Sequence, residues 1–269
     1  MEKEFDELVK RALSPKDEPD FWLNQNILNR TKEQKTMMKS KKKLSVAVLV
    51  AILVLCLGSV TVYAAWKYLS ASQVSQSMED RKLAAAFTGR QAVTINETQC
   101  YGGYRVTMLS IISGKNLSEH PSFSNGSILS DRTYAVVAIE YANGMPMPDV
   151  TEEAYLNLEL FASPLIAGYN PVHYNLASMN GNHTTITEDG VLYRMLECDN
   201  VELFADNQIY LCVTDSIFYN REAYNYDEKT GKITRNESYR GLNALFSIPL
   251  DASKANPKKA AEYIESMWD

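Results

Sequence analysis

Cysteine and histidine are scarce in this chain, which has four Cys and three His among 269 residues. Four cysteines are too few for a disulfide-stapled scaffold, and 12 Gly and nine Pro exclude collagen-like and low-complexity chains. The sequence also lacks a Gly-x-Ser-x-Gly elbow, a His-Glu-x-x-His zinc motif, a phosphate-binding loop and a Gly-x-Gly-x-x-Gly fingerprint. We therefore expect a protein that is not an enzyme and that holds no metal or cofactor.

Charge is absent from residues 44–65 (LSVAVLVAILVLCLGSVTVYAA), which contain no Asp, Glu, Lys or Arg. As a helix with about 1.5 Å rise per residue, this run spans roughly 33 Å, and a hydrocarbon core is about 30 Å thick. Tyr63 and Trp66 stand together at its end, where aromatic rings prefer the membrane–water interface. We predict one transmembrane helix over residues 44–66.

Basic side chains gather just before the apolar run, because residues 30–43 hold seven Lys and Arg against Glu33 alone. Short segments rich in Lys and Arg stay on the cytoplasmic side of a membrane, so we expect a cytoplasmic N-terminus and an extracellular C-terminal part. The competing interpretation is a signal peptide cleaved after Val62-Tyr63-Ala64. Such peptides have a shorter apolar run, of about 7 to 15 residues, close to their start. The prediction is therefore a cell-membrane protein with an uncleaved anchor.

The two sides of the predicted membrane helix differ in charge. Residues 1–43 hold 11 basic and 8 acidic side chains, whereas residues 66–269 hold 16 basic and 25 acidic ones. A nucleic-acid-binding surface needs clustered Lys and Arg to contact phosphates. The acidic outer part therefore argues against nucleic acid as a partner.

The first 43 residues contain two stretches with helical patterning. Apolar residues recur every three or four positions from Phe5 to Leu13, Ser14-Pro15 ends that stretch, and a second helix is expected to start near Pro19. So short a segment cannot bury its own apolar face, which favours docking to a cytoplasmic protein. The alternatives are adsorption to the inner membrane surface and disorder. The candidate partner-binding residues are Phe5, Leu8, Val9, Leu13, Trp22, Ile27 and Leu28.

A helical segment next to the membrane is predicted over residues 67–89. Ser70 and Gln73 form a capping box, apolar residues follow at mostly helical spacing, and Gly89 ends the segment. One or two short helices fit this pattern.

Residues 90–269 alternate strand-like runs with turn signals such as Tyr101-Gly102-Gly103 and Glu188-Asp189-Gly190, without long intervening helices. This pattern favours antiparallel pairing over alternating strand–helix–strand units. The predicted fold class is mainly β (α+β): an antiparallel β-sheet or sandwich flanked by the helical segment and by a C-terminal helix that opens at Asn256-Pro257 and packs on the sheet. The predicted strands are residues 91–98, 104–112, 133–142, 155–163, 183–188, 191–198, 208–215 and 243–250.

Two features of this outer part invite a chemical interpretation. Residues 225–236 (NYDEKTGKITRN) lack the alternating acidic ligands and the distal Glu of a calcium loop, so a hairpin turn with Gly231 in a bulge is the better prediction. Cys100, Cys198 and Cys212 cannot all pair within one chain. Free buried thiols are favoured, and a bridge between Cys198 and Cys212 is the alternative.

The three histidines, His120, His173 and His183, are expected to be solvated loop residues and not catalytic bases or metal ligands. The last two belong to the stretch YNPVHYNLASMNGNHTT (residues 169–185), which is rich in Asn, Tyr and His and could line a recognition surface. Fifteen of the 16 tyrosines follow the apolar run. This abundance suits either a binding face or the aromatic packing of a β-sandwich.

Five strings carry a resemblance to a known family: residues 18–24 (EPDFWLN), 61–67 (TVYAAWK), 95–98 (INET), 103–107 (GYRVT) and 131–136 (DRTYAV). The chain resembles a family of single-pass membrane proteins of low-GC Gram-positive bacteria. Their external part is a domain of unknown function, and their genes commonly neighbour extracytoplasmic-function sigma factors. The resemblance implies an anti-sigma-like layout, in which a cytoplasmic segment holds a sigma factor and an external domain acts as a sensor.

The expected organisation is a cytoplasmic segment (1–43), a transmembrane helix (44–66), a helical segment (67–89) and an extracellular β-rich domain (90–269). Residues 1–43 lack the His-x-x-x-Cys-x-x-Cys of zinc-containing anti-sigma factors. The expected function is a membrane-anchored signalling regulator with a sigma factor as its cytoplasmic partner. The alternatives are a surface-tethered binding module without a transcriptional role and an envelope enzyme in which His173 or His183 meets carboxylates.

Overall fold

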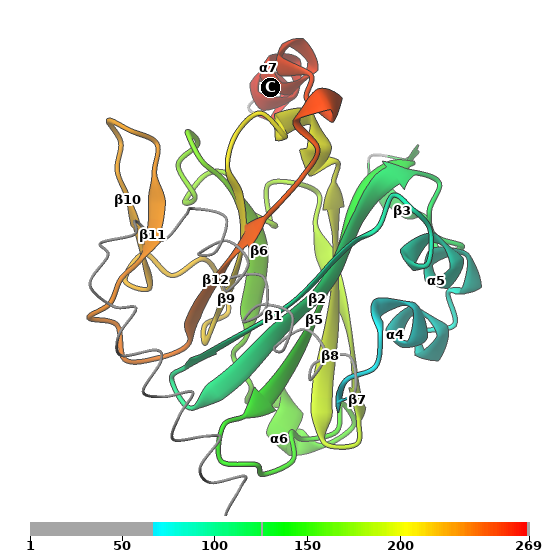
Figure 1. Ribbon diagram of the computed structural model, residues 1–269, viewed down its shortest axis with the longest axis vertical. Coiled ribbons are helices and arrows are strands. Elements are labelled where there is room, and N and C mark those ends of the chain that lie inside the picture. The colour runs from blue at the N-terminus through cyan, green and yellow to red at the C-terminus, as the bar shows by residue number, and fades with distance from the viewer. Residues whose placement is uncertain (1–66, 125, 268–269) are drawn as a thin grey trace, which may run out of the picture. The chain divides into compact units, whose positions relative to one another are not determined.

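The computed structural model describes residues 67–124 and 126–267 (Figure 1). The predicted cytoplasmic segment 1–43 and membrane helix 44–66 lie outside the described residues, and so do all seven candidate partner-binding residues. Among the described residues, no helix combines the length and the apolar character that a membrane span requires.

The larger of the two main sheets has five strands in the order β1-β2-β5-β8-β7. Every neighbouring pair is antiparallel. A bulge interrupts β1 between Thr94 and Glu97, where Asn96 adopts a positive φ of 51°, a conformation that Asn tolerates better than most residues. The strands are β1 Val93–Tyr101, β2 Tyr104–Lys115, β5 Asp131–Tyr141, β7 Asn182–Glu188 and β8 Val191–Asp199.

The smaller main sheet has three antiparallel strands in the order β12-β9-β6: β6 Phe161–Ile166, β9 Ile209–Thr214 and β12 Asn243–Ile248. The two sheets share one hydrophobic core, to which Val137 of β5 and Leu211 of β9 both belong. The side chain of Gln99 joins them at one edge: its Nε2 donates to the carbonyl oxygen of Leu245 at 2.9 Å, and its Oε1 accepts from the Leu245 N–H at 2.9 Å. The side-chain amide thus imitates a strand partner between the sheets.

Two short helices, α4 (Ala71–Ser77) and α5 (Arg81–Phe87), cover the other face of the five-stranded sheet (Figure 1). The predicted capping box is present at the start of α4, and Asp80 caps α5 by accepting from the Leu83 N–H at 2.8 Å. Val74 and Leu83 are fully buried against this sheet face. The central strands β2, β5 and β8 are therefore buried on both faces, which explains their nearly unbroken apolar sequences.

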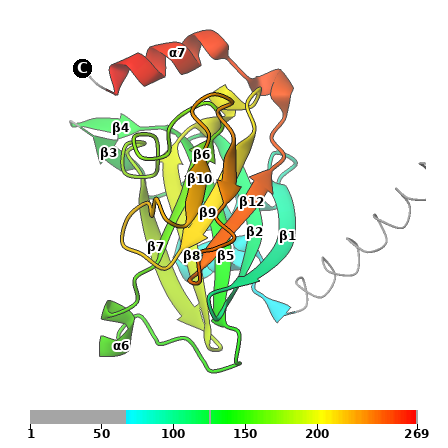
Figure 2. The same cartoon turned by 90° about the vertical axis from the view of Figure 1, so that its left-hand side faces the viewer.

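The β10–β11 hairpin packs on the outer side of the three-stranded sheet, where Figure 2 shows it in front of β9 and β12. It is the hairpin predicted over residues 225–236, but Gly231, at φ 70°, lies in its connecting loop and not in a bulge of the ladder. The remaining elements are β3 Ser122–Ser124, β4 Ser127–Leu129, α6 Glu153–Leu156, η1 Val201–Phe204, β10 Tyr224–Tyr226, β11 Ile233–Arg235, η2 Ala252–Lys254 and α7 Pro257–Ser266.

The mainly β, antiparallel character predicted from the sequence is confirmed. The predicted strand at residues 155–163 is wrong in its first half, because residues 153–156 form α6 and β6 starts only at Phe161. The alternating apolar residues YLNLELF suit a short helix as well as a strand, so the local pattern does not decide between them.

The C-terminal helix starts as predicted, with Asn256 as its N-cap and Pro257 in its first turn. We predicted that this helix packs on the sheet, but it does not lie on a sheet face. Figures 1 and 2 show α7 across one end of the two sheets, where the Tyr263 ring contacts Phe204 of η1 edge-on at 6.1 Å. Ala260 is its one fully buried residue among those described, and the sheet faces are already covered by other elements.

Candidate functional site

The first three described residues are held against the five-stranded sheet. Lys67 Nζ lies 2.6 Å from Oε1 of Glu140, the Tyr68 hydroxyl donates to Oε2 of the same carboxylate, and the Leu69 N–H donates to the Tyr193 hydroxyl at 3.0 Å. We call these five residues the junction, because they join the three residues directly after the predicted membrane helix to the sheet.

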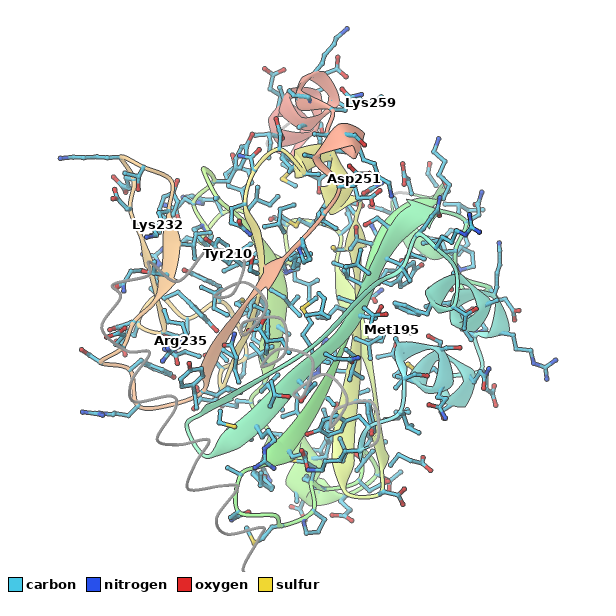
Figure 3. The ribbon with its side chains drawn as sticks, in the orientation of Figure 1. Met195, Tyr210, Lys232, Arg235, Asp251 and Lys259 are labelled. Atoms are coloured by element: carbon cyan, nitrogen blue, oxygen red, sulfur yellow. The ribbon has the colours of Figure 1, made fainter. Side chains whose placement is uncertain are left out.

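The register of the sheet brings the two acceptors of the junction together. Glu140 follows Ile139 on β5, and Ile139 pairs with Leu192 of β8, next to Tyr193. Tyr68 is 7% exposed and belongs to the core beneath α4 and α5. Along the same strand, Met195 (labelled in Figure 3) accepts a long hydrogen bond from Ser75 of α4 at 3.9 Å. The junction therefore continues into the contact between α4 and the sheet.

Two cations lie beside Glu140, and the two tyrosines of the junction are held neutral. Lys67 and Arg105 both lie near the carboxylate, the latter with Nη1 at 3.8 Å from Oε2. Burial, reinforced by the bond to Glu140, raises the pKa of the Tyr68 hydroxyl well above its ordinary value of 10.0. Burial also raises the pKa of Tyr193. Both phenols therefore keep their protons and act as hydrogen-bonding groups at neutral pH.

A hollow of about 490 Å³ opens beside the junction. Its walls include the turn at Gly144–Pro146, the β7–β8 turn at Asp189–Gly190, and Gln73 of α4. Met145 on this rim is 58% exposed. Its lining is mostly polar and charged, with Lys67, Glu140, Glu188 and Asp189 among the residues that face the hollow.

The histidines are dispersed. His120 is in a loop, with Nε2 at 3.3 Å from the carbonyl oxygen of Glu79. His183 is exposed and lies on β7, which agrees with the predicted strand 183–188 and not with the loop expected for the histidines. His173 is exposed in the loop after β6 and lines a second hollow together with Glu228. His173 thus lines a hollow that also holds a carboxylate, whereas His183 is on a strand of the five-stranded sheet.

Among the described residues, no group of three or more His, Cys, Asp or Glu side chains is arranged to hold a metal ion. Cys198 and Cys212 are free buried thiols, as favoured from the sequence, whereas Cys100 is free but exposed. Cys198 and Cys212 lie on different sheets within the shared core, and burial raises the pKa of each thiol to about 12. Buried, protonated thiols are poor nucleophiles.

The family models, curated proteins and solved structures contain no match to this chain. Its function must therefore be argued from its own residues. The junction was missed at the sequence level, although Glu140 is the only charged residue in the predicted strand 133–142. A lone carboxylate in a buried strand needs a partner, and that rule is the signal that points to Glu140. Its partners, Lys67 and Tyr68, are more than 70 positions away.

Proposed function

We propose that the chain is a membrane-anchored, anti-sigma-like signalling regulator, in which residues 1–43 hold a cytoplasmic sigma factor and the outer β domain controls the anchor. The junction is the observation that carries this proposal. Lys67, Tyr68 and Leu69 are bound to Glu140 and Tyr193 instead of forming a linker between the apolar run and the domain.

A regulator with one membrane helix must pass a change in its outer domain to that helix. A flexible Gly/Ser-rich linker would absorb such a change. Residues 66–71 contain no Gly or Pro, and the capping box of α4 begins directly after Leu69. Two states of the domain can shift the anchor only if they differ in contacts with this segment, and the junction supplies contacts of that kind. A domain that is merely tethered has no need of them.

Sigma binding is tested by co-purifying the full chain with the sigma factor encoded beside its gene. The full chain should retain the sigma factor, whereas a variant lacking residues 2–28 should lose it. A full chain that is correctly inserted in the membrane but binds no sigma factor would contradict the proposal.

Coupling is tested by Glu140→Gln, which removes the charge that Lys67 and Tyr68 bind while keeping the shape of the side chain. We expect altered sigma-dependent transcription with unchanged sigma binding. The matched control is Glu202→Gln, because Glu202 also pairs with a lysine at 2.8 Å and is 14% exposed, against 12% for Glu140. Equal transcription in the two variants would show that the junction does not transmit a signal. A tethered binding module predicts no effect of either variant.

A further inference from the structure

A second hollow, of about 340 Å³, lies on the outer side of the three-stranded sheet, away from the junction. We call it the tyrosine hollow. One wall comes from the Asn- and Tyr-rich stretch at residues 169–185. The other comes from the β10–β11 hairpin and the segment before it. Lys232 and Arg235, labelled in Figure 3, mark this hairpin. Its principal lining residues are Asn170, His173, Tyr219, Arg221, Tyr226 and Glu228.

The floor of the tyrosine hollow is a fixed aromatic ring. Tyr224 is 2% exposed. Its hydroxyl lies 2.9 Å from the carbonyl oxygen of Val213 and 2.9 Å from that of Ala244, within hydrogen-bond distance of both. Tyr219 stacks on Tyr224 with 6.0 Å between ring centroids and 20° between ring planes. Burial raises the pKa of both phenols, so the rings stay neutral. The hollow thus has a rigid, uncharged aromatic wall before any ligand arrives.

The two walls are tied to each other. The Gly168 N–H donates to the carbonyl oxygen of Gly231 at 2.8 Å, which joins the loop after β6 to the hairpin loop. A Cβ on Gly231 would stand 2.5 Å from the Gly168 Cα, so only glycine permits this approach. Asn170 is held by its own Asx turn, with Oδ1 accepting from the Val172 N–H at 3.1 Å. A site built on such fixed loops binds without a large ordering cost.

The lining carries one charge of each sign, and exposed apolar residues precede it in the chain. Arg221 and Glu228 are both exposed, and the positive charge of the arginine offsets the negative charge of the glutamate. Ile217 and Phe218, which directly precede Tyr219, are 62% and 72% exposed. The surrounding domain is acidic, because residues 66–269 hold 25 acidic against 16 basic side chains. A polyanion would be repelled by this field, so a neutral ligand fits better.

We propose that the tyrosine hollow binds a neutral oligosaccharide of the cell envelope. A pyranose ring offers C–H groups on its faces, which pack on tyrosine rings, and hydroxyl pairs at its edge. The guanidinium of Arg221 and the amide of Asn170 can donate to those hydroxyls, while the Glu228 carboxylate accepts from them. The volume lies within the range of roughly 300 to 1,000 Å³ that is usual for small-molecule sites. This inference rests on the outer placement of the β domain in the proposed function, but binding here does not depend on a sigma factor.

The test uses the full chain in lipid nanodiscs, which avoid sugar-based detergents. Titration calorimetry with an N-acetylglucosamine tetramer and with maltotetraose should give saturable binding of at least one. Poly(glycerol phosphate) serves as the anionic probe and an unstructured Gly/Tyr peptide as the peptide probe. Tyr219→Ala should weaken oligosaccharide binding by about tenfold, a loss of about 1.4 kcal/mol. Tyr219→Phe should retain binding, because the ring face remains.

The matched control is Tyr141→Ala. Tyr141 belongs to another tyrosine pair, with Tyr104 at 5.3 Å between centroids, on the five-stranded sheet. Unchanged thermal unfolding of each variant guards against simple misfolding. The proposal is overturned if neither oligosaccharide binds, if only the anionic or the peptide probe binds, or if Tyr219→Ala and Tyr141→Ala have equal effects. A chain that binds the oligosaccharide but no sigma factor would contradict the proposed function alone.

Discussion

Arg132 and Glu197 form an ion pair inside the domain, with Nε of Arg132 at 2.8 Å from Oε1 of Glu197 and the arginine side chain only 2% exposed. The same guanidinium pairs with Asp199 and donates to the carbonyl oxygen of Asn180 at 2.6 Å. Asp199 in turn accepts from the Tyr263 hydroxyl of α7 at 2.9 Å. One buried cation thus holds β5, β8, the loop before β7 and, through Asp199, the C-terminal helix together.

Replacing this cation should unfold the domain more easily. Arg132→Met leaves two carboxylates without their partner in a partly buried place, and breaking a buried ion pair from one side costs about 3 to 5 kcal/mol. Because Glu197 and Asp199 keep some contact with water, we expect the low end of that range. Urea unfolding of the purified chain measures the loss. Lys258→Met is the control, since its pair with Glu262 is 3.9 Å long and exposed, and it should leave stability unchanged.

The turn between β1 and β2 offers a test of close packing. Gly102 and Gly103 both have positive φ, of 57° and 82°, so alanine at either position costs about 1 to 2 kcal/mol of backbone strain. A Cβ on Gly102 would also stand 2.2 Å from the backbone of Gly241, whereas a Cβ on Gly103 meets nothing within 4 Å. Gly102→Ala should therefore lower the melting temperature markedly more than Gly103→Ala. Equal shifts would contradict the docking of this turn on the chain before β12.

Alkaline pH should destabilise the fold through its two core cysteines. Burial raises the pKa of Cys198 and Cys212 from 9.0 to about 12. An unfolded chain releases these protons first as pH rises, so the free energy of unfolding should fall between about pH 9 and pH 12. The effect is absent below the unfolded pKa, where both states are protonated. Urea unfolding at successive pH values measures it.

The control for the pH experiment is a variant with Cys198→Ala and Cys212→Ala, which should be less stable at neutral pH but lose less stability between pH 9 and pH 10. Above pH 10 the buried tyrosines, such as Tyr68 with its raised pKa, add the same dependence in both proteins. A variant with the same slope as the parent near pH 9.5 would show that the thiols are not the cause. Alkylation near pH 8 should modify exposed Cys100 before either core cysteine.

Local signals in the sequence predicted much of the secondary structure. The capping box at Ser70 and the glycines at 102 and 103 act over a few residues, so each could be recognised without knowing its surroundings. The short β3–β4 hairpin was not foreseen, because three-residue strands carry too little pattern. The division into two sheets was also hidden, since which strand pairs with which depends on contacts far apart in the chain.

In the candidate sites, too, some residues carried a local signal in the sequence and others did not. Composition indicated that the stretch around His173 could line a recognition surface, and three of its residues line the tyrosine hollow. Tyr219 comes from a stretch some 50 residues later that had no distinguishing pattern, and Tyr226 belongs to the predicted hairpin at residues 225–236. Their meeting with His173 depends on the Gly168–Gly231 contact between two loops.

The sequence by itself determined the distribution of charge: a basic stretch, an uncharged run at residues 44–65 and an acidic remainder. These are properties of consecutive residues, and a predicted membrane anchor follows from them alone. Only the tertiary structure decided that Tyr68 meets Glu140 and that three tyrosines surround one hollow. Such contacts depend on strand register and on loops closing over a sheet, and no local pattern along the chain encodes where two distant segments meet.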